Sequence, residues 1–148
     1  MNRITRIEGL NNLTLLEKLF LYGNDIAVLE GLENLKKLKE LHINRNRIRD
    51  TVSRLVYNDK LELLNASHNK IPESELENIA HLVSCLSQIR SLDLYGNPLS
   101  QHQTYKYRLC ANAAGTLERF DGLNLKAGSF MRDRLDQMKK EEDTNRLI

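Results

Sequence analysis

The chain has 148 residues, enough for one domain with a substantial core. Its 22 Lys and Arg residues nearly balance its 20 Asp and Glu residues, so the net charge of +2 gives no field that would favour nucleic acid or an anionic membrane as a direct partner. No stretch approaches the roughly 18 apolar residues of a membrane span, and we expect no secretory signal. Two cysteines, Cys85 and Cys110, are too few for a disulfide scaffold. Both are expected to be buried free thiols, which favours a cytosolic or nuclear compartment.

An asparagine recurs along the chain in a fixed apolar context. It stands at positions 2, 24, 46, 69 and 97, at intervals of 22, 22, 23 and 28 residues. The last four each follow apolar residues in one register, and an Ile or Leu comes two residues later, which gives the pattern L-x-x-L-x-x-L-x-L-x-x-N-x-I. The third copy is weaker, because Asn58 takes its first position. The best copy has Leu13, Leu16, Leu19 and Leu21 before Asn24.

Each part of this pattern has a physical cause. Leu19 and Leu21 point to one face of a short strand because strand side chains alternate. Strands stacked in parallel at about 4.8 Å would bury those leucines in one continuous core. A buried asparagine amide donates and accepts at once, so a column of them can satisfy the backbone groups inside each turn. The pattern therefore predicts an α/β solenoid with a parallel concave sheet.

The returning, convex side of each repeat depends on the repeat length. In the 22-residue repeats it should be extended or a single 3₁₀ turn. The 28-residue repeat differs, because Pro72 and the acidic Glu73 and Glu75 suit the first turn of a helix. A stripe at helical spacing then predicts an α-helix over about residues 73–86. Its members are Leu76, Ile79, Ala80, Val83 and Leu86.

With this motif, the chain resembles the short-repeat leucine-rich family typified by a regulatory subunit of protein phosphatase 1. The matching pieces are N-x-I-x-x-I-E-G-L at Asn2–Leu10 and N-D-I-A-V-L-E-G-L at Asn24–Leu32. Axonemal dynein light chain 1 and the spliceosomal A-prime protein belong to the same structural class. The closing segment, with Asn97-Pro98-Leu99, Tyr107-Arg108, Leu117 and Phe120-Asp121-Gly122, resembles the cap of such solenoids. In that cap a helix and a last strand cover the final repeat.

The resemblance spans about residues 1–125 and predicts the domain organisation. We expect a leucine-rich repeat domain over 1–125, with repeats ending near 12, 34, 57 and 85 and a cap at about 98–125. Residues 126–148 form a tail in which Phe130, Met131, Leu135 and Met138 predict an amphipathic helix. That helix packs on the solenoid or provides a second docking or coiled-coil segment.

The N-terminal edge of the predicted solenoid has no visible polar cap, although solenoids need one. The chain starts at the convex half of a repeat whose strand is missing. It is therefore expected to be a fragment or to have a diverged start. The alternative is that the first strand is covered by a partner or by a second copy of the chain.

The outward residues of each strand form the concave face, and the core does not dictate what occupies them. Phe20 is the most informative, because a solvent-facing aromatic is a poor use of about 200 Å² of apolar surface. With Tyr22 and Tyr95 it supplies aromatic anchors, while Arg45 and Arg119 supply the forked donors that binding hot spots favour. The candidate partner-binding residues are Lys18, Phe20, Tyr22, Glu40, His42, Asn44, Arg45, Asn65, Ser67, His68, Asp93, Tyr95 and Arg119.

No constellation for catalysis is recognisable. His42 and His68 lie at non-equivalent positions of successive repeats, without a Cys or carboxylate at metal-ligand spacing. Neither cysteine has a histidine placed to make a nucleophile, no glycine-rich phosphate loop occurs, and an open sheet excludes water poorly. We therefore expect no cofactor, no metal and no enzymatic activity.

The function expected from the sequence is protein binding on the concave face. The chain would be an adaptor or regulatory subunit of a ciliary, cytoskeletal or phosphatase-type assembly in the cytoplasm. One alternative is a nuclear ribonucleoprotein component that holds an RNA-binding protein, as the resemblance to the A-prime protein implies. Another is a fragment of a longer solenoid. The sequence leaves the partner and the oligomeric state open, including self-association through the N-terminal edge.

Overall fold

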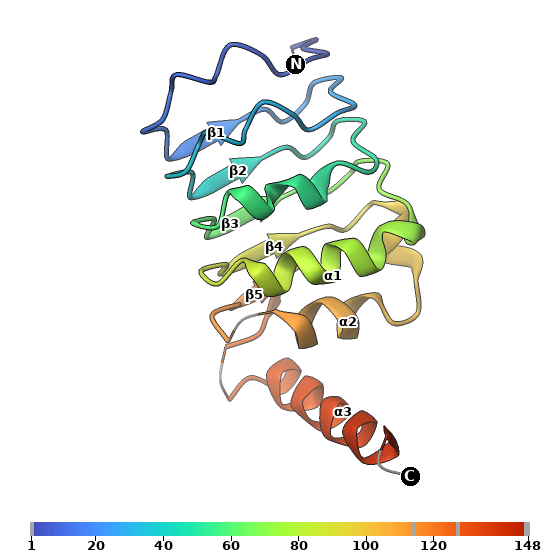
Figure 1. Ribbon diagram of the computed structural model, residues 1–148. Helices are drawn as coiled ribbons and strands as arrows, with labels where there is room; N and C mark the ends of the chain where they lie inside the picture. Colours follow the sequence, from blue (N-terminus) through green and yellow to red (C-terminus); the bar gives the residue numbers. More distant parts are fainter. Residues whose placement is uncertain (1, 114, 127, 147–148) are drawn as a thin grey trace.

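The computed structural model describes residues 2–113, 115–126 and 128–146, which wind into a short coil of stacked turns (Figure 1). Each turn adds one strand to a six-stranded sheet in the order β1-β2-β3-β4-β5-β6. The first five strands pair in parallel, and the last runs antiparallel to its neighbour. The predicted solenoid with a parallel sheet is thus confirmed. The strands are β1 (Lys18–Phe20), β2 (Glu40–His42), β3 (Leu63–Asn65), β4 (Ser91–Asp93), β5 (Arg119–Phe120) and β6 (Leu123–Asn124).

The middle residue of each strand points into the coil and is aligned with its neighbours. Leu41, Leu64 and Leu92 are register partners in successive strands and are at most 1% exposed. Phe120 continues the row in β5 and is fully buried. Because each repeat buries the leucines of the next, one core runs along the coil.

A column of buried asparagines satisfies the backbone where the chain leaves the strands. Asn46 is typical: its Nδ2 donates to the carbonyl oxygens of Ile43 and Leu21, each at 3.0 Å. Its Oδ1 accepts the Ile26 backbone N–H at 3.1 Å. Asn69 makes the equivalent bonds one turn on. Each amide thus links two repeats, which explains why the sequence keeps asparagine in register.

The residue before each of these asparagines turns the chain through the left-handed region. Its φ is 70° at Gly23, 58° at Arg45, 54° at His68 and 76° at Gly96. Two of the four positions therefore carry non-glycine residues with positive φ, which is uncommon for such residues. The turn aims the side chains of Arg45 and His68 away from the core.

The convex side follows the predicted dependence on repeat length. It is extended in the 22-residue repeats and becomes a 3₁₀ helix, η1, at Val52–Tyr57. The predicted helix of the longest repeat is also present, as the 3₁₀ turn η2 (Glu73–Glu75) followed by α1 (Leu76–Cys85). Asn58 ends η1 and, 1% exposed, donates to the carbonyl oxygens of Leu32 and Leu35. A polar side chain therefore occupies the first leucine position of the weak third copy.

Beyond β4, two helices and a hairpin end the coil. The 3₁₀ helix η3 (Pro98–Gln101) leads to α2 (Tyr105–Asn112), which lies beside α1 on the convex side (Figure 1). Strands β5 and β6 then turn at Asp121 and Gly122, and α3 (Phe130–Arg146) follows. The predicted helical tail is therefore present from residue 130, and residues 127 and 147–148 of that prediction lie outside the described residues.

The opposite end of the coil leaves its core open. Leu13 is 47% exposed and Leu15 is 72% exposed, and Leu16 and Leu19 are only partly buried. The residues equivalent to Leu13, Leu16 and Leu19 one repeat on, Leu35, Leu38 and Leu41, have no exposed surface. Within the described residues, β1 is therefore an uncovered edge strand.

Candidate functional site: the concave face of the sheet

The strand register sorts the concave residues into rows across the sheet. One row joins Phe20, His42, Asn65 and Asp93, and the row beside it joins Lys18, Glu40, Leu63, Ser91 and Arg119. A third row follows the strands and contains Tyr22, Asn44, Ser67 and Tyr95. The sheet thus brings the predicted residues of different repeats together on one surface. Their role in binding a partner stays a prediction.

An aromatic pair lies at the N-terminal end of this surface. The rings of Phe20 and His42 stack with centroids 4.5 Å apart and planes 8° from parallel. Phe20 nevertheless keeps 55% of its surface exposed, and Tyr22 beside it keeps 59%. The stack covers one face of Phe20 and leaves the rest of the ring in water, so it is available as an apolar anchor.

Glu40 bonds both His42 of that pair and the neighbouring Lys18. Its carboxylate accepts a hydrogen bond from His42 Nε2 at 2.8 Å and lies 3.7 Å from Lys18 Nζ. The bond from His42 is the main cause that lowers the pKa of Glu40, and Lys18 adds to it. The carboxylate therefore stays ionised and fixes the edge of the imidazole that stacks on Phe20.

A second aromatic pair lies further along the surface. The His68 imidazole meets the Tyr95 ring edge to face, with centroids 5.0 Å apart. Tyr95 is 44% exposed. Together with the first pair, it places an open aromatic ring on each half of the concave face.

Asp93 is the carboxylate at the centre of the C-terminal half. Its burial, and then the charge of Asp121, raise its pKa above the usual range, while Arg119 and His42 act in the opposite direction. Asp121 itself is occupied: it accepts the backbone N–H groups of Leu94 and Tyr95 and the hydroxyl of Tyr105. A cation from a partner would relieve the repulsion at Asp93.

Of the thirteen predicted residues, six are exposed, six are half-buried and one, Ser67, is buried. Ser67 is 1% exposed and its hydroxyl donates to Asn65 Oδ1 at 2.8 Å, so it presents almost no surface to a partner. Asn44 is half-buried, and its Oδ1 is buried without a hydrogen-bond partner. Arg45 is exposed, but its positive φ carries it from the strand row to the rim.

The concave face also contains a residue outside the predicted partner-binding set. Leu63 is the register partner of Glu40 and Ser91 and is partly exposed beside them. The signal that identifies it is the strand alternation, which turns Leu63 outward when Leu64 turns inward.

The described residues contain no group of three or more His, Cys, Asp and Glu side chains that could hold a metal ion. Cys110 is buried, and burial raises the pKa of its thiol to about 12. Cys85 is only half-buried, contrary to the expectation, with its Sγ 3.7 Å from His81 Nε2. In the part of the chain that is described, no helix combines the length and hydropathy needed to cross a bilayer.

Comparison with known proteins supports the fold. A family model described as Leucine Rich repeats (2 copies) matches residues 14–55. No curated protein matches the chain. Among solved structures, a chain of the Drosophila melanogaster SNF/U2A' complex is similar at a TM-score of 0.74 and 24% identity, over 99% of this chain and 83% of that one.

Two bacterial proteins are also similar, over a smaller share of their own length. An internalin of Listeria monocytogenes has a TM-score of 0.66 and 29% identity, and this chain spans 80% of its own length and 32% of the internalin. A leucine-rich repeat protein of Leptospira interrogans has a TM-score of 0.62 and 23% identity, with 80% and 29% covered. With the repeat register and the parallel sheet, these similarities show that the chain has the leucine-rich repeat solenoid fold.

Proposed function

We propose that this chain is a non-catalytic interaction module that binds a folded partner protein on its concave face, as an adaptor or regulatory subunit of a larger assembly. The observation that carries the proposal is the stacked pair of Phe20 and His42, which holds an aromatic ring in place while most of it remains in water. A fixed aromatic side chain loses little conformational freedom on binding, which is why such residues dominate binding hot spots.

The energetics favour a protein partner over solvent at this position. Burying the exposed part of the Phe20 ring, about half of its surface, would contribute about 2 kcal/mol. Lys18, Glu40, Asp93 and Arg119 surround the aromatic residues with both signs of charge. A mixed rim around apolar anchors suits the surface of a folded protein, whereas a phosphate backbone would require cations alone.

The open shape of the site supports a binding role over catalysis. Most reactions need reacting groups that are held out of water, and the concave residues stand on a sheet that is open to solvent on this side. Among the titratable groups there, Glu40 forms a hydrogen bond with His42 and an ion pair with Lys18.

A second candidate is a component of a ribonucleoprotein that holds an RNA-binding protein. Its support is the similarity to a chain of the SNF/U2A' complex, which extends over almost the whole of this chain. This candidate expects nuclear residence, whereas an adaptor of a ciliary, cytoskeletal or phosphatase assembly would be cytoplasmic. Localisation of the tagged chain in cells separates the two.

The test uses a concave variant and a matched convex variant in parallel affinity purifications. Phe20→Ser/Tyr22→Ser removes two exposed rings from the concave side, and Val28→Ser/Tyr57→Ser removes exposed apolar groups, 40% and 54% exposed, from elsewhere. We expect a stoichiometric partner to be lost with the first variant and retained with the second, at equal thermal stability. Retention of every partner by both variants would refute the concave site.

A further inference from the structure

A second surface, the rim on which the chain leaves the strands, carries most of the excess positive charge of the molecule. After each strand the chain bends at the residue before the asparagine, and the asparagine and the Ile or Leu two residues after it are buried while most of the alternate residues face outward. The strand arrows of β1–β4 in Figure 1 point towards this rim. We call the outward positions 3, 5, 23, 25, 27, 45, 47, 49, 68, 70, 72, 96 and 98 the exit rim.

The exit rim contains five cationic side chains and one carboxylate. The cations are Arg3, Arg45, Arg47, Arg49 and Lys70, and the carboxylate is Asp25. Five positive charges less one negative charge leave +4, against +2 for the whole chain. The two acids nearest to it along the chain, Asp50 and Glu73, lie on the convex side of the rim.

The repeat register brings these cations together. Arg47 donates its backbone N–H to Ile26, one residue after Asp25, and Lys70 donates to Ile48, one residue after Arg47. Asp25 donates likewise to Ile4, next to Arg3. Arg3, Asp25, Arg47 and Lys70 therefore stand in one column about 4.8 Å apart from turn to turn. Arg49 lies about 6.6 Å from Arg47 along the extended part of the same turn, and Arg45 lies at the left-handed bend before it.

Most of these side chains are free for an external anion. Arg3, Arg45, Arg47, Arg49 and Lys70 are all exposed. Within the described residues, the exit rim has one ion pair, Arg47 Nε to Asp25 Oδ1 at 3.6 Å, with 69% of the arginine side chain exposed. The charge is therefore not neutralised by the fold.

We propose that the exit rim binds an extended acidic segment of a partner protein. Carboxylates on alternate residues of an extended chain stand about 6.8 Å apart, close to the spacing of Arg47 and Arg49, and Arg45 adds a third guanidinium at the bend before them. Guanidinium groups bind carboxylates through two parallel hydrogen bonds, so several neighbouring arginines select an acidic segment over a single acid. This surface shares Arg45 and His68 with the predicted contact residues of the concave face, and it goes beyond the function proposed above.

The same cations could attract single-stranded RNA, but the rim lacks the second element of such sites. Proteins that bind single strands combine a basic groove with aromatic rings on which bases stack. His68 is the one aromatic residue among the described exit-rim positions, and its imidazole already packs edge to face against Tyr95. An acidic protein segment fits the arrangement better.

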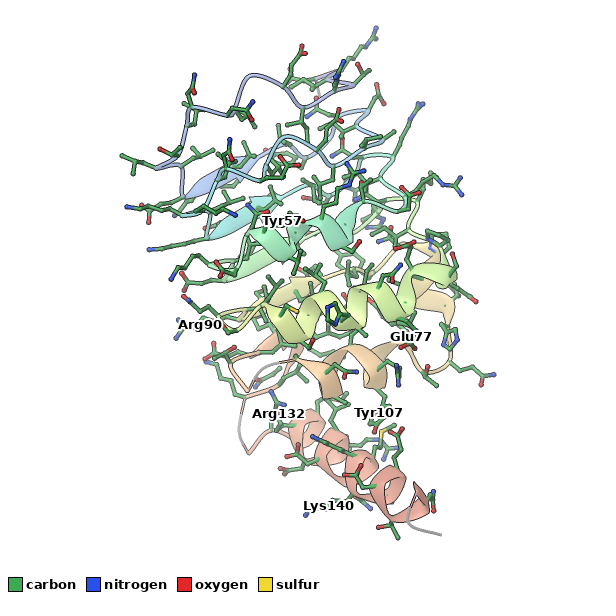
Figure 2. The ribbon with its side chains drawn as sticks, viewed as in Figure 1. Tyr57, Glu77, Arg90, Tyr107, Arg132 and Lys140 are labelled. Atoms are coloured by element: carbon green, nitrogen blue, oxygen red, sulfur yellow. The ribbon has the colours of Figure 1, made fainter. Side chains whose placement is uncertain are left out.

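The opposite rim, where the chain enters the strands, supplies a matched control. Lys37, Lys60 and Arg90 are exposed there, and Arg90 is labelled on that side in Figure 2. Neutralising these three residues changes the net charge as much as neutralising Arg45, Arg47 and Arg49. The two triple variants, Arg45→Gln/Arg47→Gln/Arg49→Gln and Lys37→Gln/Lys60→Gln/Arg90→Gln, remove the same net charge from opposite rims, the first as three arginines and the second as two lysines and one arginine.

The experiment measures fluorescence anisotropy of a labelled peptide of alternating glutamate and serine, titrated with the full chain. We expect the exit-rim variant to weaken binding at least about tenfold, the opposite-rim variant to bind within about twofold of wild type, and binding to fall as ionic strength rises from about 0.05 M to 0.2 M. The concave variant Phe20→Ser/Tyr22→Ser should bind the peptide normally, so the two proposals fail separately. Circular dichroism confirms that each variant is folded.

Three outcomes would overturn the proposal. Equal binding of a glutamine-serine peptide would show that the charge is not recognised. Equal losses in the two triple variants would show that net charge alone attracts the peptide. Tighter binding of a labelled oligouridine than of the acidic peptide, lost in the exit-rim variant, would make the rim a nucleic-acid site.

Discussion

His68 lies so close to the α-carbon of Gly96 that a Cβ at Gly96 would stand 2.5 Å from His68 Nδ1. Gly96 also has a φ of 76°, which an alanine adopts with strain. Gly96→Ala should therefore destabilise the fold by about 2–3 kcal/mol, part from the backbone and part from displacing the imidazole. Urea denaturation measures the loss.

Gly122 gives the matched control for that prediction. Its φ is 80°, but nothing lies within 4 Å of an added Cβ. Gly122→Ala should cost only the backbone part, about 1 kcal/mol. Adding His68→Ala to Gly96→Ala should restore the part of the stability that the clash removes, because the imidazole is then absent. Equal costs at the two glycines, or no rescue by His68→Ala, would show that the imidazole moves aside freely.

The asparagine column predicts a difference between its middle and its end. Asn69→Ala leaves the Ile48 N–H without its partner inside the core and removes one of the two asparagine donors to each of the carbonyl oxygens of Ile43 and Ala66. It should cost about 3 kcal/mol or more. Asn24→Ala should cost less, since Asn24 bonds Ile4 at the open end of the coil, where fraying relieves the loss. Urea denaturation of both variants, with unchanged m, provides the comparison, and an equal loss would argue that the terminal turn is as rigid as the middle.

The sequence predicts the solenoid and the concave rows because both depend on a single repeat. Once the spacing is 22 residues, Phe20 must be the neighbour of His42 and Leu19 the neighbour of Leu41. The repeat does not determine the orientation of an individual side chain that can make a hydrogen bond on either side. The Ser67 hydroxyl is directed to the Asn65 side-chain oxygen, which accepts its hydrogen bond. Asn58 can replace a leucine because its amide donates to two buried carbonyl oxygens.

The non-repeating end was less predictable for the same reason. The helical spacing of Phe130, Met131 and Leu135 indicates α3, and the structure has it. Its orientation depends in part on Arg132, which bonds backbone carbonyls, and no side-chain pattern reveals a carbonyl. Phe130, the largest apolar residue of that stripe, is 77% exposed in the structure. The core position falls instead to Leu135.

Asp93 should make the protein less stable at neutral pH than it would be with a neutral residue there. Its pKa is raised in the folded state by burial and by Asp121, so the folded protein binds a proton more readily than the unfolded chain. Stability therefore rises as pH falls through the window between the usual value of 3.8 and the raised value, and is lower above it.

Asp93→Asn removes that dependence. We expect it to raise the free energy of unfolding at pH 7 by less than about 1 kcal/mol, since the carboxylate is half-exposed and screened by water. The gain should shrink as pH falls towards 4. Thermal melts of both proteins across this range provide the measurement. A variant less stable than wild type at pH 7 would mean that the attraction of Arg119 and His42 outweighs burial and Asp121.

Arg132 is expected to hold α3 on the rest of the molecule. Its Nε donates to the Leu125 carbonyl oxygen and its guanidinium Nη2 to that of Leu117, both at 2.7 Å, and Figure 2 labels it at the junction. Leu117 and Leu125 flank the β5–β6 hairpin, so one side chain ties the helix to both ends of it. Leu135, 5% exposed, packs into the core beside the partly buried Met131, and Tyr107 of α2 donates its hydroxyl to Glu142 of α3.

Arg132→Ala should therefore loosen α3 without unfolding the coil. Two charge-assisted hydrogen bonds are worth about 3 kcal/mol, and the loss falls on a helix that is only locally stabilised. Amide hydrogen exchange in residues 130–146 should speed up by about a hundredfold, while exchange in β2 and β3 stays within about twofold. Arg134→Ala, which removes an exposed arginine two residues further along α3, should leave the exchange in both regions unchanged. If exchange accelerates equally in α3 and in the sheet, α3 is an integral part of the coil rather than a helix docked on its end.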